Sequence, residues 1–291
     1  MTHTSTGRAR RGFTLVELLV GVVIFAIIGA LMTKLISTQG RYYDRQGMSN
    51  AARNVSRSSL NRIISDFRMI EASGGVVAAS PTSLTIKIPY AIGIECGDDA
   101  GSPVYSHLTL LPVDSETYVL SSFYGYAWRS ATTGVYTYVE AGAIESDAGS
   151  AAVCTGVAVT TVPGGRVVKV TPNLPVGAGL GTPVFLYSKV RYEFKASTAI
   201  PGKLGLYRTV ISQAGGETTE ELVAPFANTA KWRFFTLNGG SVAQDAAPAD
   251  LTTLRGLELH LDGTSESIAA TKLAPETAPF TTAVFFKNRT N

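Results

Sequence analysis

Hydrophobic residues dominate the start of the chain, where a long apolar run follows a short polar leader. Between Phe13 and Thr33 the only charged residue is Glu17. As an α-helix this segment would be roughly 30 Å long, about the thickness of the hydrocarbon core of a bilayer. The pattern therefore predicts a transmembrane helix at residues 13–33, preceded by a leader at residues 1–12.

A second, amphipathic pattern continues this helix beyond the predicted membrane segment. No proline occurs before Pro81, and the run Ser73-Gly74-Gly75 is a stop signal, so we expect one helix over residues 13–71. Its apolar positions after residue 50 recur mostly every three or four residues, and they are Ala52, Val55, Leu60, Ile63, Phe67 and Ile70. This apolar face predicts packing of the helix against a globular domain.

After residue 72 the chain changes to alternating apolar and polar positions, separated by turns rich in Gly, Pro, Ser and Asp. Such alternation is typical of half-buried β-strands. The predicted strands are Thr82–Tyr90, Val104–Leu111, Thr117–Trp128, Val135–Val139, Val153–Val162, Arg166–Thr171, Pro183–Lys195, Leu204–Ile211, Ala230–Leu237, Leu254–Leu261 and Thr281–Lys287. With no second long helix, the pattern predicts an α+β protein, in which the N-terminal helix packs on a large antiparallel β domain (72–291) of two sheets.

The charge of the chain gives no reason to expect a specific nucleic-acid partner. Charged residues make up 16% of the sequence, below the average of about a quarter. The net charge of +3 is that of Arg8, Arg10 and Arg11, because without the leader 22 basic residues face 22 acidic ones. Those leader arginines instead favour a cytoplasmic N-terminus for the predicted transmembrane helix.

The extramembrane half of the helix is basic, with Arg41, Arg45, Arg53 and Arg57 spaced in pairs four residues apart. A solvated helix face is the expected role of these arginines. Contacts with neighbouring subunits or with phospholipid head groups are the alternatives. Direct DNA binding is disfavoured, because no aromatic residue lies between Arg53 and Arg62 to stack on bases.

Glu17 needs a physical reason, because a carboxylate within a membrane segment is costly unless it is paired. Either it lies shallow enough to stay hydrated, or it has a cationic partner. If the chain is cut after Gly12, Phe13 carries a new α-amine in the same membrane layer. That amine would lie about one turn from Glu17 in the same chain, or beside Glu17 of a neighbouring subunit.

The run from Arg10 to Val20, with Gly12-Phe13 and Glu17 at its centre, resembles the processing site of type IV prepilins and type II secretion pseudopilins. The resemblance implies cleavage by a membrane prepilin peptidase between Gly12 and Phe13, and N-methylation of Phe13. It also implies that Glu17 docks onto an N-terminal amine during filament assembly. The expected location is the inner membrane, with the N-terminus in the cytoplasm, and afterwards the periplasm and a cell-surface pilus.

Other features favour a minor subunit that assembles with other minor and major pilins. Many major pilins have a proline in the apolar run, and this chain has none there. Short motifs similar to minor subunits of the pilus W and secretion J types are Val190–Phe194, Gly205–Arg208, Trp232–Phe235, Leu257–Leu261 and Phe280–Arg289. They imply a minor pilin that acts in the initiation of a type IV pilus or at its tip.

Three alternatives stay open beside the minor pilin. One is a J-like minor pseudopilin of a type II secretion system. Another is a signal-anchored periplasmic domain with a binding or adhesive role. The third is an adhesin-like or DNA-uptake subunit that contacts its ligand through residues 91–180, a region that carries no family resemblance.

The two cysteines predict a disulfide rather than a catalytic or metal site. Cys96 and Cys154 both fall in the part predicted to lie outside the cytoplasm, where disulfides form. Two free buried thiols are the alternative. Their spacing matches no redox or zinc motif.

No other residues form a recognisable catalytic set. His107 and His260 each fall in a predicted strand, and the motifs of serine hydrolases, zinc proteases and phosphate-binding loops do not occur. The acidic clusters Glu95–Asp99 and Asp262–Glu266 could hold Ca²⁺, but neither is a complete calcium loop, so we expect solvated acidic turns. The sequence therefore predicts a protein that is not an enzyme and that needs no cofactor or metal.

Overall fold

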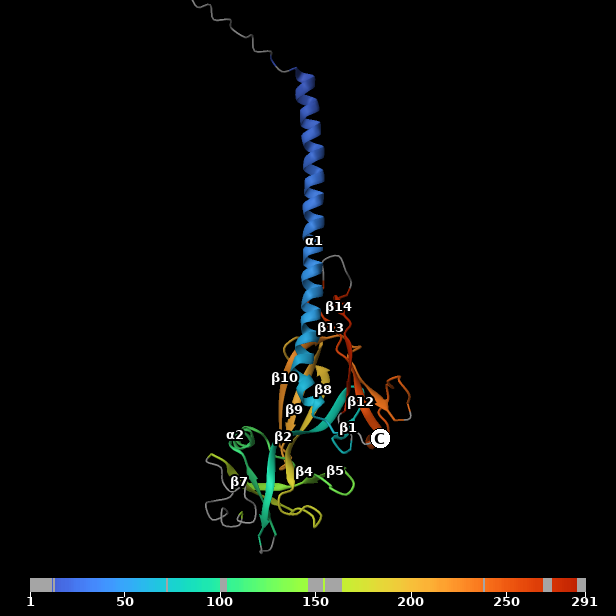
Figure 1. Ribbon diagram of the computed structural model, residues 1–291. Helices are drawn as coiled ribbons and strands as arrows, with labels where there is room; N and C mark the ends of the chain where they lie inside the picture. The colour runs from blue at the N-terminus through green and yellow to red at the C-terminus, as the bar shows by residue number, and fades with distance from the viewer. Residues whose placement is uncertain are drawn as a thin grey trace, which may run out of the picture.

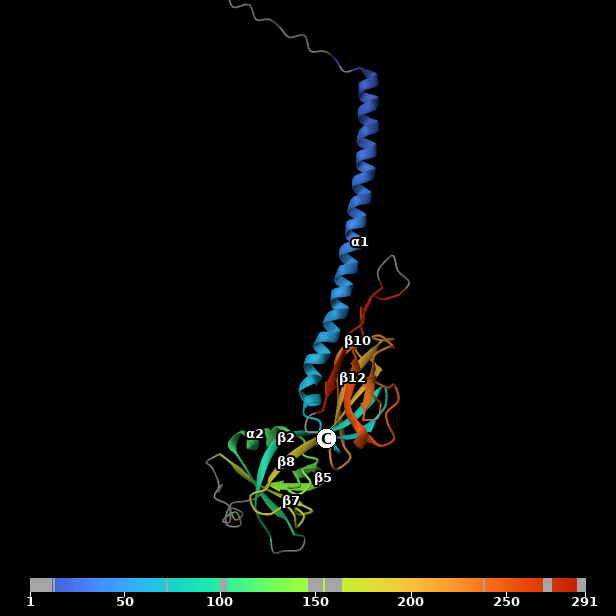
Figure 2. The same ribbon diagram turned by 45° about the vertical axis from the view of Figure 1, so that its right-hand side comes forward.

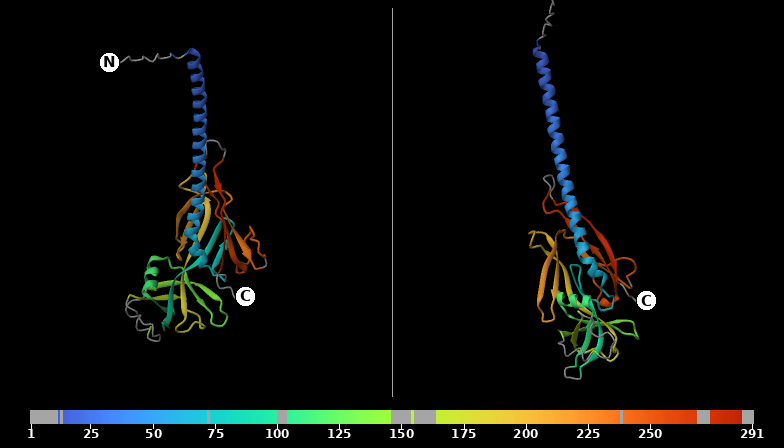
Figure 3. Two further views of the ribbon diagram at one scale, coloured as in Figure 1. Left: turned by 45° about the horizontal axis from the view of Figure 1, so that its top comes forward. Right: turned by 60° about the vertical axis from the view of Figure 1, so that its left-hand side comes forward.

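One long helix projects from a β-rich body (Figure 1). The computed structural model describes residues 12, 14–71, 73–99, 104–145, 154, 164–237, 239–268 and 274–286. The helix, α1 (Leu15–Arg68), is continuous over 54 residues, which corresponds to about 80 Å. Its N-terminal half stands clear of all strands, and its C-terminal half packs against them (Figure 3).

α1 ends three residues earlier than the sequence predicts. Met69 caps the helix, and its N–H donates to the carbonyl oxygens of Asp66 and Phe67. The chain must then reverse to enter β1 (Val76–Ala79), and Gly74 makes this turn with a φ of +83° that other residues rarely adopt. The Gly-Gly stop signal thus marks the turn after the helix rather than its last residue.

Fifteen strands and one further helix follow in the described part of the chain. They are β2 (Ser83–Asp98), β3 (Ser106–Leu110), α2 (Pro112–Leu120), β4 (Gly125–Arg129), β5 (Tyr136–Glu140), β6 (Gly142–Glu145), β7 (Arg166–Thr171), β8 (Pro183–Ala196), β9 (Leu204–Ile211), β10 (Glu217–Phe226), β11 (Lys231–Thr236), the 3₁₀ turn η2 (Leu251–Thr253), β12 (Leu254–His260), β13 (Gly263–Thr264), β14 (Thr277–Ala278) and β15 (Thr281–Phe285), with β1 before them.

These strands form two antiparallel sheets, and the α+β prediction is confirmed. Twelve strands make the larger sheet, whose main path runs β14-β13-β10-β9-β8-β2-β3-β7-β6, with β1, β4 and β5 branching from it. The smaller sheet has the order β11-β12-β15. The two longest strands, β2 and β8, pair with each other from Ser83–Glu193 to Ile94–Pro183.

The prediction of one strand over Thr117–Trp128 is wrong. Its first part lies in the short helix α2, which begins with Pro112 in its first turn, where a fixed φ favours helix. Ser115 supports this turn by donating its hydroxyl proton to the carbonyl of Leu111 at 2.9 Å. Only β4 remains as strand. The predicted strand Val153–Val162 lies outside the described residues, apart from Cys154.

The C-terminal half of α1 lies against both sheets, and we call this part of the molecule the helix layer. Ile63, Phe67 and Ile70 are buried there, as the apolar pattern predicts. The Phe67 ring meets Tyr192 of β8 edge-on at 5.2 Å and Trp232 of β11 at 5.6 Å between ring centroids. One aromatic side chain of the helix therefore joins the larger sheet to the smaller one.

Farther from the N-terminal half of α1, a second core forms what we call the distal layer. It contains α2, β3, β4, β5, β6 and β7, and β2 and β8 run into it from the helix layer (Figure 2). Leu108, Tyr126 and Val168 are fully buried at its centre. None of the residues in this second core comes from α1, so the two layers have separate apolar interiors.

Candidate functional site

The first turn of α1 places Glu17 beside Thr14. The Glu17 carboxylate accepts hydrogen bonds from the backbone N–H and the hydroxyl of Thr14, both at 3.0 Å, and the Thr14 hydroxyl accepts from the Glu17 N–H at 3.3 Å. These bonds make a capping box at the helix N-terminus. The spacing Thr14-x-x-Glu17 carries that signal in the sequence, although the interpretation of Glu17 as the partner of an amine overlooked it.

The apolar half of α1 has no cover within the chain. Leu15 is 81% exposed and Phe25 is 78% exposed. Among the described residues, α1 is the only helix long and apolar enough to cross a membrane, with a mean hydropathy of 2.8 in its most apolar window. This surface needs lipid or other helices as its surroundings. Gly12 is described and exposed, whereas Phe13 lies outside the described residues.

The basic middle of α1 contacts the body through Arg45, whose guanidinium lies 3.1 Å from the carboxylate of Glu276. Arg53, Arg57 and Arg62 are exposed, which agrees with a solvated face. Deeper in the helix layer, the Ser56 hydroxyl accepts from the N–H of Gly263 at 3.0 Å.

In the acidic cluster Asp262–Glu266, Asp262 has a structural role that corrects the interpretation as a solvated turn, whereas Glu266 is exposed. Asp262 is buried, and its carboxylate accepts from the Thr229 hydroxyl at 2.7 Å and from the Phe280 N–H at 3.1 Å. A Cβ on Gly263 would lie 2.1 Å from the Ala52 carbonyl oxygen. The segment is therefore a close contact between β13 and α1, and only glycine fits at its centre.

The cluster Glu95–Asp99 is also held by protein groups. Asp98 accepts from the Ser106 hydroxyl at 2.5 Å. Asp99 lies 2.8 Å from Nε2 of the buried His107 and 3.4 Å from Nζ of Lys169. The hydrogen bond from His107 is the main cause that lowers the pKa of Asp99.

Glu95, which precedes Cys96 in β2, is buried, and its environment disfavours its charge. It is only 3% exposed, and Oε2 has no hydrogen-bond partner among the described residues. Burial raises the pKa of Glu95 to about 7, and the nearby Asp98 adds to this shift. The expectation of a solvated turn is therefore wrong at Glu95 as well.

Cys96 and Cys154 are joined by a disulfide, with their Cα atoms 4.6 Å apart. Both are buried and pack against Val167 of β7. Among the described residues, no group of three His, Cys, Asp or Glu side chains could hold a metal ion. Nε2 of the buried His107 in β3 lies 2.8 Å from Asp99, and Nε2 of His260 in β12 lies 2.6 Å from Glu258, so each of these nitrogens has a carboxylate as its neighbour.

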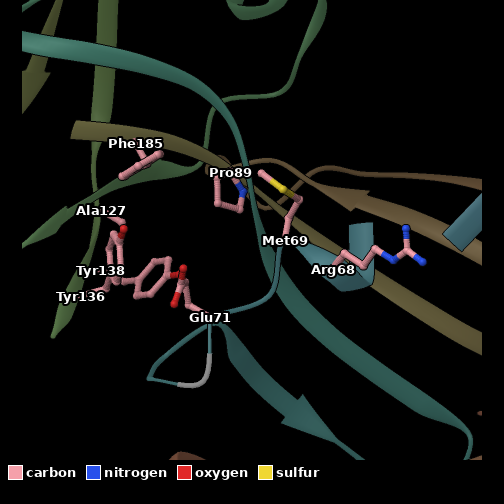
Figure 4. Close-up of a pocket in the computed structure, with 8 residues that line it drawn as sticks. All are labelled: Arg68, Met69, Glu71, Pro89, Ala127, Tyr136, Tyr138 and Phe185. Carbon is pink, nitrogen blue, oxygen red and sulfur yellow. The ribbon is translucent and has the colours of Figure 1, made fainter. Parts of the chain in front are cut away.

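A cup-shaped cavity of about 190 Å³ opens where α1 ends and the distal layer begins. Its lining comes from the end of α1 and from four strands, and consists of Arg68, Met69, Glu71, Pro89, Ala127, Tyr136, Tyr138 and Phe185. Figure 4 shows the aromatic side chains gathered on one side and Met69 and Pro89 on the other. No local pattern in the sequence marks these residues, because the fold brings them together from distant segments.

Comparison with known proteins assigns only the N-terminal segment. The prokaryotic N-terminal methylation motif matches residues 7–33. The match supports the prepilin and pseudopilin superfamily. Comparison with curated proteins gives no match, and comparison with solved structures gives none either. The motif covers residues 7–12 of the expected leader, the expected cleavage position and the first turns of α1, including the capping box at Thr14 and Glu17.

Proposed function

We propose that this protein is a minor pilin that takes part in type IV pilus assembly, in the initiation of the filament or at its tip. The observation that carries the proposal is the uncovered apolar part of α1, which begins within an N-terminal methylation motif and contains Glu17 as its only acid up to residue 33. Such a helix suits a subunit that first lies in a membrane and then exchanges lipid contacts for contacts with other helices. The protein is thus a structural subunit rather than an enzyme.

In this mechanism a prepilin peptidase cuts between Gly12 and Phe13, and the new N-terminal amine of Phe13 is methylated. The β-rich body remains in the periplasm while α1 still spans the inner membrane. The subunit then leaves the bilayer as α1 packs against other minor and major pilins. The absence of proline from the apolar part of α1 agrees with a minor subunit, because the helix there is uninterrupted.

Glu17 has two partners at different stages of this mechanism. Before assembly the hydrogen bonds from Thr14 hold its carboxylate at the helix N-terminus, which reduces the cost of placing the carboxylate near lipid. During assembly the amine of a neighbouring subunit approaches the same carboxylate. A charge pair in low dielectric tolerates the loss of one partner poorly, so this contact sets the register of the incoming subunit.

The identity of the mature N-terminus tests the processing step. Mass spectrometry of the protein isolated from membranes should find a chain that begins with N-methylated Phe13. A chain that retains residues 1–12, or one that begins at another residue, contradicts the proposal at its first step.

The fraction of the protein that enters filaments tests the role of Glu17. We expect Glu17→Ala to be cleaved normally and to remain in the membrane, because the docking charge is missing. Glu220→Ala, which removes an exposed glutamate from β10, is the matched control and should reach sheared filaments like the parent chain. Normal incorporation of Glu17→Ala would refute the docking role.

A J-like pseudopilin of type II secretion would share the same helix and processing site. Deleting the gene distinguishes the minor pilin from the pseudopilin, because it should disrupt either pilus assembly or type II secretion. Loss of pili with normal secretion supports the minor pilin, whereas loss of secretion with normal pili assigns the protein to the secretion system.

A further inference from the structure

The cup at the end of α1 is a preformed cavity rather than a loose surface depression. Tyr138 is held by Gly74, at which a Cβ would lie 3.0 Å from the Tyr138 ring, and by an edge-on contact with Tyr187 at 5.4 Å. Tyr136 meets Phe185 at 5.7 Å with an angle of 62° between the rings. Because these contacts fix the aromatic walls, a ligand would not have to order them.

An irregularity in β2 opens the cup. The pairing of β2 with β8 shifts register between Pro89 and Ala91, and Pro89 lines the cavity. Such bulges bend a strand and often lie next to functional sites. Ala127 of β4 also lines the cup, and its small side chain fills little of the space.

The size and shape of the cup favour one puckered ring. A volume of about 190 Å³ is below the roughly 300–1,000 Å³ of pockets that enclose drug-sized ligands. Tyr136 and Phe185 meet at a steep angle and form a corner. A corner offers two aromatic surfaces to the C–H groups of a saturated ring.

The charges around the cup favour a neutral ligand with hydroxyl groups. Glu71 reaches the cup, and its carboxylate lies near the Tyr136 and Tyr138 side chains (Figure 4). The Lys87 ammonium already lies 4.8 Å from the centre of the Tyr138 ring, and Arg68 adds a second positive charge at the border. A cationic ligand would meet both positive charges, and a purely apolar one would bury the Glu71 carboxylate without new hydrogen bonds.

We propose that this cup binds a neutral hexopyranose unit, such as the terminal sugar of a glycan. The C–H face of the sugar would lie against Tyr136 and Phe185, and its hydroxyls would donate to the Glu71 carboxylate. The site is formed by residues that remain outside the membrane, and it does not depend on filament assembly. The sugar site would give a recognition role to the region around β4 and β5, which lies outside the methylation motif.

Saturation-transfer NMR on the full chain tests this site. The protein is kept in micelles of a zwitterionic detergent without sugar head groups, and cellobiose, maltose and lactose are the probes. We expect saturation to reach the ring C–H protons of at least one of these disaccharides. Tyr136→Ala should weaken that binding about tenfold through loss of one wall, and Tyr136→Phe should retain it. Tyr105→Ala, an aromatic substitution outside the cup, is the matched control and should have no effect.

A second variant keeps the test valid if Tyr136→Ala does not fold. Glu71→Gln preserves the shape of the side chain and should weaken sugar binding several-fold, with unchanged tryptophan fluorescence of the body. The proposal is overturned if none of the three disaccharides receives saturation, or if Glu71→Gln and Tyr136→Ala both bind like the parent chain. It is also overturned if tetramethylammonium binds in a Tyr136-dependent manner and the sugars do not, because the cup would then be a cation site.

Discussion

Replacing Glu95 with glutamine should stabilise the protein at high pH and not at low pH. Glu95 is 3% exposed, and one carboxylate oxygen has no partner among the described residues. Burial raises the pKa of this carboxyl from its ordinary value of 4.5 to about 7. The folded protein therefore holds a proton that the unfolded chain releases more easily.

The size and sign of the effect follow from that difference. Below pH 4.5 both states are protonated, and Glu95 contributes nothing to pH dependence. As the pH rises from 4.5 to about 7, the unfolded chain is ionised first, so the folded state loses stability. At about 1.4 kcal/mol per pKa unit, the loss is complete above pH 7 and reaches roughly 3 kcal/mol as an upper bound.

Urea unfolding of the full chain in detergent, followed by the fluorescence of Trp128 and Trp232, measures this effect. Glu95→Gln is compared with the parent at about pH 4 and about pH 8, where the carboxyl has opposite charge states in the unfolded chain. The difference in free energy of unfolding between the two proteins should grow by about 2–3 kcal/mol in favour of glutamine at the higher pH. If burying the glutamine amide costs the same free energy at both pH values, that cost cancels when the two pH values are compared.

The control for this experiment is Glu220→Gln, which changes an exposed glutamate on β10. Its difference from the parent should be the same at both pH values. If Glu95→Gln also follows a curve parallel to that of the parent, Glu95 is ionised in the folded protein without penalty, and the argument from burial is refuted.

Three further predictions concern stability, each measured by unfolding of the full chain in detergent. Phe67→Ala should lower the free energy of unfolding by about 3–5 kcal/mol, because it removes a fully buried ring between the two sheets. Met69→Ala, at a residue that is 50% exposed, is the control and should lower it far less. Equal losses for the two variants would contradict the role of Phe67. Replacing both Cys96 and Cys154 by serine should lower the free energy of unfolding by about 4 kcal/mol, because the bridge closes a loop of 58 residues. A reductant should destabilise the parent protein and leave this double variant unaffected. Partial burial alone would raise the pKa of Glu221, but hydrogen bonds from Ser197, Thr198 and Tyr207 outweigh burial and lower this pKa to about 2. The ionised Glu221 should therefore stabilise the folded protein above pH 4.5, and this stabilisation should be lost as the pH falls toward 2. Glu221→Gln should lose on the order of 1 kcal/mol near neutrality after allowance for solvent screening, and an acid-unfolding profile identical to that of the parent would rule this contribution out.

The helix and the central strands could be predicted because each carries its own periodic signal. The apolar positions from Ala52 to Ile70 recur at helical spacing, and the alternation in Pro183–Lys195 marks β8. Both patterns reflect a single buried face, so local sequence is enough to find them. The capping box of Thr14 and Glu17 is equally local, and its spacing could have identified the partner of Glu17 within the chain.

The elements that escaped prediction depend on contacts between distant residues. β10 begins with the polar run Glu217–Glu221, which is mostly exposed and has no apolar alternation. It is a strand because its backbone pairs with β9 from Glu217–Ile211 onward. α2 was hidden by an apolar pattern that suits either a strand or a helix, and the proline in its first turn decided the outcome.

The candidate sites divide in the same way. Gly12, Phe13 and Glu17 belong to one continuous motif, so sequence alone points to processing and assembly. The cup combines Met69, Tyr136 and Phe185, which no pattern connects. The burial of Glu95 likewise depends on packing of the distal layer around β2, so an acidic turn was the natural expectation from its neighbours in the sequence.

The pairing of β2 with β8 has a mechanical consequence. These strands carry the chain from the layer that contains α1 into the distal layer, and their ladder runs from Ser83–Glu193 to Ile94–Pro183. A tension that pulls the distal layer away from the helix acts along both strands, so their continuous backbones carry it in parallel and the hydrogen bonds between them are not opened one after another. A body attached in this way can transmit a pulling force from its outer end to α1 without first separating its two layers.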